Sequence, residues 1–150
     1  MFFSFDKLFT KVLIKTDDPK ELSLSDKDLL VIYSDRLHSV VGNPRVRKLF
    51  KSIHIDDDMQ QVVFDLKEPL NDGLDVDFVI NVLSTGMVIE WLQPKVDSIK
   101  HTSVMIGGKD ERKIVDNYKS MIERLDNLKS ELAKLIRDHG SVNNRYLSGK

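Results

Sequence analysis

Apolar residues recur at helical spacing along most of the chain, and this periodicity predicts a mainly helical fold. One apolar face runs through residues 25–41, where Ser25 and Asp28 have the arrangement of a capping box at a helix start. The next two signals, Asn43 and Pro44, suit the cap and the first position of a further short helix. Start signals and periodicity agree in this stretch, so the sequence predicts two helices in succession.

The most apolar segment is 77–93, and a helix that is apolar on all sides is buried, so we expect it at the centre of the core. Gly86 lies inside this segment, and a residue that small would let a neighbouring backbone approach. Pro94 is expected to end the helix. Residues 97–108 then have the composition of a polar loop, except for three consecutive apolar residues that predict burial or contact with a neighbouring subunit. These three are Val104, Met105 and Ile106.

The C-terminal part carries the most regular pattern, a heptad repeat over three periods that predicts one long helix over residues 110–139. Such a helix would be about 45 Å long at ~1.5 Å per residue. The stripe consists of Ile114, Tyr118, Met121, Leu125, Leu128, Leu132 and Leu135. The polar residues 141–150 are expected to form an extended tail.

Two segments allow more than one interpretation. Residues 1–20 predict an amphipathic N-terminal helix, which would cover the protein's own core or a protein partner rather than a membrane surface. Residues 44–53 fit a short helix, and residues 55–70 fit helical spacing too, although Val and Phe in 61–66 also suit a strand. We predict helix for 55–70 and keep the strand as the alternative.

These elements predict the mainly α fold class: a single domain over 1–150, with about five helices, a long C-terminal helix and an extended C-terminal tail. The length of 150 residues, with 41% hydrophobic and 31% charged residues, fits one folded domain. The chain has no cysteine, which excludes disulfides and thiolate metal sites. Its apolar runs are too short to span a bilayer.

The distribution of charge along the chain is more informative about function than any sequence motif. The chain has 23 basic and 24 acidic side chains, but residues 1–51 hold 10 basic and 7 acidic ones, whereas 54–90 hold 1 basic and 9 acidic. Before the acidic stretch lies a basic cluster, which could contact phosphate, meet an acidic face of a neighbouring subunit, or be a solvated surface. The cluster consists of Arg45, Arg47, Lys48 and Lys51.

Candidate chemistry is sparse, and we therefore predict a protein that is not an enzyme and that binds neither cofactor nor metal. The four histidines show no metal-binding spacing. The run at residues 56–58 lacks the alternation of a calcium loop, and Gly107-Gly108-Lys109 lacks the features of a phosphate loop. Near-neutral net charge and the absence of interleaved aromatic residues argue against a dedicated nucleic-acid binder.

Three stretches together suggest a family. Residues 86–98 end in Trp-Leu-Gln-Pro-Lys-Val-Asp-Ser, residues 107–112 carry a glycine pair, and residues 143–147 read Asn-Asn-Arg-Tyr-Leu after the long helix. In this order they resemble small virion structural proteins of large tailed bacteriophages, of the head-to-tail connector, adaptor or neck type. The resemblance covers roughly the C-terminal half of the chain.

The resemblance implies a helical, non-enzymatic subunit that assembles into a homo-oligomeric ring. It implies portal, neck or tail components as partners, and a location in the virion, with the host cytoplasm as the place of assembly. The candidate interface residues are the three apolar loop residues, the basic cluster, and the tail residues Asn143, Asn144, Arg145, Tyr146 and Leu147.

Two other functions fit the same patterns. A small regulatory or adaptor protein could bind a cellular partner through its heptad helix. A nucleic-acid binder could use the basic cluster at 45–51, in which case its affinity would fall steeply with salt.

Overall fold

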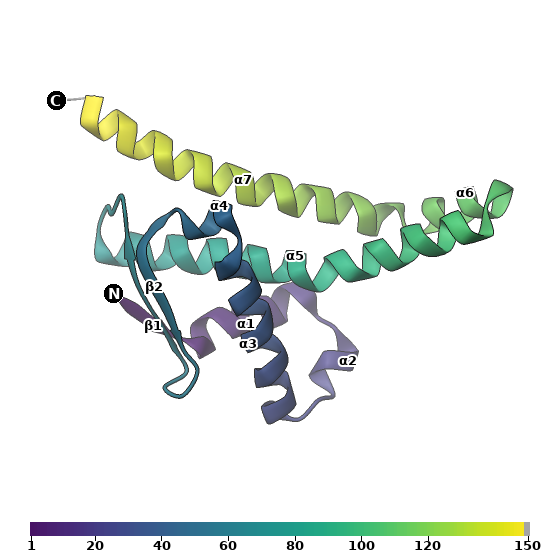
Figure 1. Ribbon diagram of the computed structural model, residues 1–150, viewed down its shortest axis with the longest axis horizontal. Helices are drawn as coiled ribbons and strands as arrows, with labels where there is room; N and C mark the ends of the chain where they lie inside the picture. The colour runs from purple at the N-terminus through teal and green to yellow at the C-terminus, as the bar shows by residue number, and fades with distance from the viewer. Residues whose placement is uncertain (149–150) are drawn as a thin grey trace.

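The computed structural model describes the backbone of residues 1–148 and the side chains of residues 1–141. Within that part, a three-stranded antiparallel sheet lies against a set of helices, two of which extend well beyond it (Figure 1). The elements in chain order are β1 (Phe2–Ser4), α1 (Phe5–Thr16), α2 (Pro19–Leu22), α3 (Asp26–Gly42), α4 (Pro44–Arg47), β2 (Phe50–Asp56), β3 (Gln61–Leu66), α5 (Asp72–Ile106), α6 (Gly108–Asn117) and α7 (Lys119–Ser148). The predicted mainly helical, single-domain fold is confirmed.

Local start signals act as the sequence predicts. The Ser25 hydroxyl accepts a hydrogen bond from the backbone N–H of Asp28 at 3.2 Å and caps α3. The Asn43 side chain accepts the N–H of Arg45 at 2.9 Å and caps α4. The N-terminal helix is α1, and its apolar face is buried in the protein's own core, which confirms one of the two favoured interpretations. The buried residues on this face are Phe5, Leu8, Phe9 and Val12.

The helix predicted over 55–70 is wrong, and so is the end of the short helix over 44–53. Helix α4 stops at Arg47, and a β-hairpin follows, with Asp56 paired to Gln61 at its turn. Along β3, Val62, Phe64 and Leu66 are buried while the residues between them are exposed. Residues 61–66 therefore form a strand, in which buried and exposed side chains alternate with period two. Strand β1 pairs with the other side of β3 and completes the sheet.

Helix α5 is the buried central helix that the sequence predicts, but it is about twice as long as expected. From Val79 to Val88 nearly every side chain is buried between the other elements. Pro94 lies inside the helix rather than at its end. A proline removes one helical hydrogen bond and bends the helix, and Figure 1 shows α5 bending along its length. Leu92 and Val96, one on each side of Pro94, both belong to a buried cluster with Leu125 of α7.

The loop predicted over 97–108 is also wrong in extent, because α5 continues to Ile106. Only Gly107 and Gly108 form the reversal, with backbone φ of 69° and 66°, a left-handed region that favours glycine. The helix predicted over 110–139 is present but is interrupted at Tyr118, between α6 and α7. The α7 backbone continues as helix to Ser148, where the sequence predicted an extended tail over 141–150.

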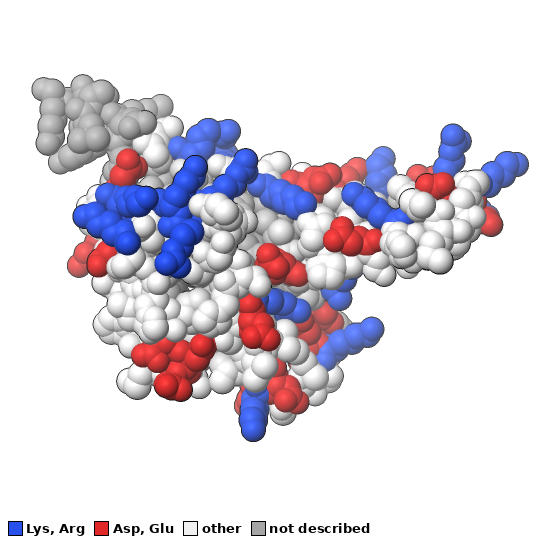
Figure 2. Space-filling view, viewed as in Figure 1, with Lys and Arg blue, Asp and Glu red and all other residues white. Residues whose placement is uncertain are grey.

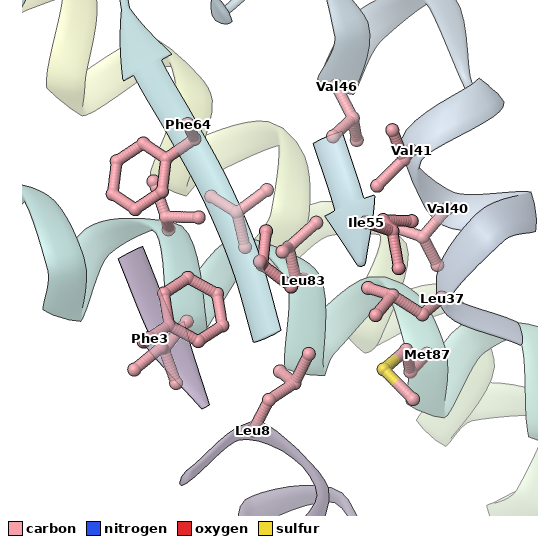
Figure 3. Packing of buried hydrophobic residues seen from close by; sticks show 14 of the residues in the cluster. Phe3, Leu8, Leu37, Val40, Val41, Val46, Ile55, Phe64, Leu83 and Met87 are labelled. Carbon is pink, nitrogen blue, oxygen red and sulfur yellow. The ribbon is translucent and has the colours of Figure 1, made fainter. Parts of the chain in front are cut away.

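The core lies between one face of the sheet and helices α1, α3 and α5. Figure 3 shows Phe3 and Phe64 of the sheet at one side of this cluster, Met87 of α5 with Leu37 of α3 at the other, and Leu83 of α5 between them. The middle of α7 adds the partly buried Leu128, Leu132 and Leu135 to this cluster. Sequence-distant segments therefore share one core, and the sheet, although small, contributes Phe3, Phe50, Ile55, Val62, Phe64 and Leu66 to it.

Gly86 marks the closest approach of α3 and α5, although its neighbour there is a side chain rather than a backbone. A Cβ at Gly86 would lie 2.6 Å from Cγ1 of Val40, which is too close for unstrained packing. We expect Gly86→Ala to destabilise the fold by about 1–3 kcal/mol, although alanine favours a helix by ~1 kcal/mol over glycine. Urea unfolding measures the difference.

Gly140→Ala is the matched control, because a Cβ at Gly140 in α7 meets no atom within 4 Å. This variant should be as stable as the parent or more stable. Combining Gly86→Ala with Val40→Ala should cost less than the sum of the two single changes, since the second removes the clashing methyl groups. A stable Gly86→Ala variant would show that α3 and α5 are not tightly packed here.

Candidate interaction surfaces

The most prominent feature outside the core is an arm, which we define as residues 94–121. It consists of α5 beyond Pro94, the glycine reversal, α6 and the start of α7, and it projects away from the sheet and from α1–α4 (Figure 1). Leu92, Val96 and Leu125 form a second, smaller buried cluster at its base. The arm is therefore an antiparallel helical hairpin, anchored at one end.

The tip of the arm exposes the three apolar residues that the sequence singled out. Val104 is 71% exposed, Met105 75% and Ile106 52%. Consecutive residues lie ~100° apart around a helix, so the three spread over about 200° of its circumference. No single neighbouring helix of the chain could cover all three. Exposed apolar residues gathered in this way are typical of contact surfaces.

A groove runs along the arm beside this tip, with a volume of about 640 Å³. It separates α5 from α6 and the start of α7, and Tyr118 on its wall is 44% exposed. The residues that line it are Pro94, Lys95, Ser98, Ile99, Thr102, Ile114, Tyr118 and Met121. The arm thus carries an apolar groove and an apolar tip in succession.

Most of the heptad stripe is used within the chain. Leu125 is buried against α5, and Leu128, Leu132 and Leu135 pack partly buried against the two core clusters. Most of the stripe therefore packs against α5 of the same chain and against the core. Only the part of the stripe in the arm, around Tyr118, stays open.

A group of polar side chains around Trp91 fixes the base of the arm, and the sequence analysis missed it. The Trp91 indole N–H donates to Oδ2 of Asp18 at 3.0 Å. The cations of Lys95 and Arg124 lie 5.2 and 5.5 Å from the indole ring centre, within cation–π range. Arg124 also donates to the carbonyl oxygen of Lys15 at 2.6 Å. The group thereby links α1, α2, α5 and α7.

The Asp18 carboxylate is the centre of this group. The hydrogen bond from Trp91, with a smaller effect of the Lys20 backbone N–H and the Lys95 charge, lowers the pKa of Asp18 below its ordinary value of 3.8, while desolvation opposes the shift. The carboxylate also caps α2 through that N–H. No periodic pattern reports such a contact, because its members come from four separate elements.

The residues of the basic cluster, which are close in sequence, also form one exposed surface. Its four members are exposed on α4 and at the start of β2, and we call them the basic face: Arg45, Arg47, Lys48 and Lys51. Lys67 and His139 lie beside Lys48 around a shallow hollow that also includes Leu49 and Glu68. Figure 2 shows Lys and Arg side chains gathered over α4 and the neighbouring stretch of α7.

Acidic side chains gather at the opposite end of the hairpin, and Figure 2 shows them at its turn. We call this set the acidic face: Asp35, Asp56, Asp57 and Asp58. The Ser34 hydroxyl donates to Asp57, and His38 Nε2 lies 2.9 Å from its other carboxylate oxygen. The Ser34 hydrogen bond first, and then His38, lower the pKa of Asp57. These contacts hold the turn against α3.

The remaining sequence predictions concern chemistry and the tail. Within residues 1–141, no group of three or more potential ligand side chains could hold a metal ion. None of the described helices is long and apolar enough to cross a membrane. Asn143, Asn144, Arg145, Tyr146 and Leu147 belong to the α7 backbone, but their side chains lie outside the described residues.

Comparison of the chain with protein-family models, with curated proteins and with solved structures gives no match.

Asp18→Ala tests the anchoring of the arm. The change removes the acceptor for the Trp91 indole N–H and the cap of α2, so we expect a loss of about 1–3 kcal/mol at neutral pH. Because folding lowers the pKa of Asp18, its stabilisation is complete above the unfolded-state value and is lost as the pH falls through the folded-state value. The difference between parent and variant should therefore be constant near neutrality and shrink in acid.

Urea unfolding at neutral and acidic pH measures both effects, and hydrogen exchange in α5 reports on the arm itself. Asp126→Ala, at an exposed position of α7, is the matched control and should change stability little. Equal stability of Asp18→Ala and the control would mean that the Trp91 group does not anchor the arm.

Proposed function

We propose that this protein is a non-enzymatic structural subunit of a tailed-phage particle, acting at the head-to-tail connector by assembly with other proteins. The observation that carries the proposal is the arm: a helical hairpin that leaves a well-packed body and ends in Val104, Met105 and Ile106, all exposed. Apolar residues at the end of a projecting element have a cost in water unless a partner covers them.

The body of the protein supports the same interpretation. In the part of the chain that the structure describes, no residue of the main core cluster belongs to the arm, so the arm adds nothing to the packing of that cluster. A projecting hairpin on a stable body is suited to reach a neighbouring subunit, because the contact adds to the fold without rearranging it. In the proposed ring, the tip and groove of the arm would contact a sister subunit or a portal, neck or tail component.

The alternative of a regulatory protein that binds a partner through its heptad helix has less support. The leucines that it would use, Leu125 to Leu135, already pack against α5 and the core. Only the open stretch around Tyr118 could serve such a partner, and that stretch belongs to the arm.

Quantitative mass spectrometry of purified virions tests the proposal directly. We expect the chain in the particle at a fixed copy number that matches a ring. Its absence from virions of the phage that encodes it, with the chain present in the infected cell, would contradict the proposal.

A variant tests the role of the arm. Val104→Glu combined with Met105→Glu places two charges where the proposed contact needs apolar side chains. The free protein should keep its stability within about 0.5 kcal/mol, because both positions are exposed. Incorporation into particles should be lost when a phage lacking the parent gene is complemented with this variant.

Ile14→Glu is the matched control, because Ile14 is 74% exposed but lies on α1 outside the arm. This variant should be incorporated like the parent. If the arm variant is incorporated as well as the control, the arm is not the assembly surface.

A further inference from the structure

We propose that copies of this chain associate head to tail, with the acidic face of one copy docked on the basic face of the next. This inference rests on the proposed function in one respect, since it names the partner and the contact within the proposed ring. The charges of the two faces and their positions do not depend on that function. The basic face is Arg45, Arg47, Lys48 and Lys51, and the acidic face is Asp35, Asp56, Asp57 and Asp58.

The two faces lie at opposite ends of one rigid element. The basic face sits on α4 and the start of β2, and the acidic face sits at the end of β2, at the turn and on the adjacent part of α3. Strand β2 has seven residues, so it separates the faces by about 20 Å at ~3.3 Å per residue. Figure 2 shows the two charge clusters apart on the same side of the molecule.

This separation prevents the charges from neutralising each other within one copy. At physiological salt the Debye length is about 8 Å, so charges about 20 Å apart are screened from one another. Each face therefore presents its own potential to an approaching molecule, although the net charge of the whole chain is only −1. A second copy is the one partner certain to carry a complementary face at the same concentration.

Both faces are held in place before any contact forms. The Asn43 side chain caps α4 at the N–H of Arg45. On the other side, Ser34 and His38 hold Asp57, and Asp56 accepts the N–H of Met59 at 3.0 Å. Fixed backbones reduce the entropy lost when two such surfaces meet, so exposed charges of this kind can direct association.

The contact joins two different surfaces, so it is heterologous. A heterologous contact repeats from copy to copy and produces a ring when the rotation closes, or an open filament when it does not. The arm is not part of this contact, since it projects away from α3, α4 and β2, which carry the two faces (Figure 1). One copy therefore has separate surfaces for its neighbours in the ring and for other components.

Nucleic acid is the main competing occupant of the basic face, and the surroundings disfavour it. In the described part of the chain, the exposed aromatic residues are Phe2 and Tyr118, and neither belongs to the basic face or to the hollow beside it. Single-stranded nucleic acid binds best where aromatic side chains stack on its bases. The acidic face on the same hairpin would also repel an extended phosphate backbone.

Charge reversal of the full-length chain tests the proposal. Arg45→Glu with Lys48→Glu brings the charge of the basic face from +4 to 0, and Asp35→Lys with Asp58→Lys brings the charge of the acidic face from −4 to 0. None of these four side chains takes part in the caps described above. By sedimentation velocity in about 0.1 M salt, each variant alone should associate at least about tenfold more weakly than the parent.

Mixing the two variants should restore association, because each supplies the face that the other lacks. A chain with all four changes has two neutral faces and should associate neither with itself nor with the parent. In about 1 M salt, where the Debye length is about 3 Å, association of the parent should fall. Lys20→Glu with Lys27→Glu, two exposed lysines elsewhere, is the matched control and should associate like the parent.

Three results would overturn the proposal: a parent that stays monomeric in low salt at its highest soluble concentration, variants that associate like the control, or a mixture that does not recover. Titration of a labelled DNA duplex and of a single strand completes the test. If Arg45→Glu with Lys48→Glu removes DNA binding while association is unchanged, the basic face is a nucleic-acid site instead. Normal particles from the charge variants would refute this contact alone, whereas absence of the chain from virions would refute the proposed function.

Discussion

The burial of α5 is the constraint on which the rest of the structure depends. Between Val79 and Val88 nearly every residue of the helix is buried, and most of these residues are apolar, so the helix is stable only when other elements cover it. Helices α1 and α3, the sheet and α7 are each placed by the need to cover one of its sides. The close approach at Gly86, where α3 crosses α5, is a direct consequence of this coverage.

The extent to which other elements cover α5 also determines where the protein has apolar surface available for a partner. The helix is enclosed up to Leu92 and Val96, and past that point only α6 and the start of α7 accompany it. The group around Trp91 lies at this boundary and joins the enclosed part to the projecting part. The arm therefore differs from a flexible extension, because its base is fixed to the rest of the protein while its tip is exposed.

Much of this arrangement could be predicted from the sequence, because it depends on signals within one segment. The caps at Ser25 and Asn43, the central buried helix and the long C-terminal helix all belong to this group. The hairpin was harder to predict, since Val62 and Leu66, four positions apart, satisfy helical and strand spacing alike. The sheet also includes β1, whose residues are about 60 positions away in the chain from their partners in β3. The same holds for Pro94, where packing by α7 outweighs the local preference of proline to end a helix.

The candidate surfaces likewise divide into those that local sequence could predict and those that depend on distant segments. The apolar tip and the basic cluster were visible as runs of neighbouring residues, although the tip was expected in a loop. The Trp91 group was invisible, because Lys15, Asp18 and Arg124 reach it from separate elements. The acidic residues at the hairpin turn were noted, but their position opposite the basic face required the strand between them.

The reversal at Gly107 and Gly108 has a consequence for how this protein could change during evolution. Two residues suffice to turn the chain, and beyond Pro94 the paired helices touch little but each other. Insertion of one heptad on each side of the turn would lengthen the hairpin by about 10 Å at ~1.5 Å per residue while preserving the register of its seam. The length of the arm can thus change without affecting the folding of the rest of the chain. Related chains could therefore reach partners at different distances with an unaltered globular part.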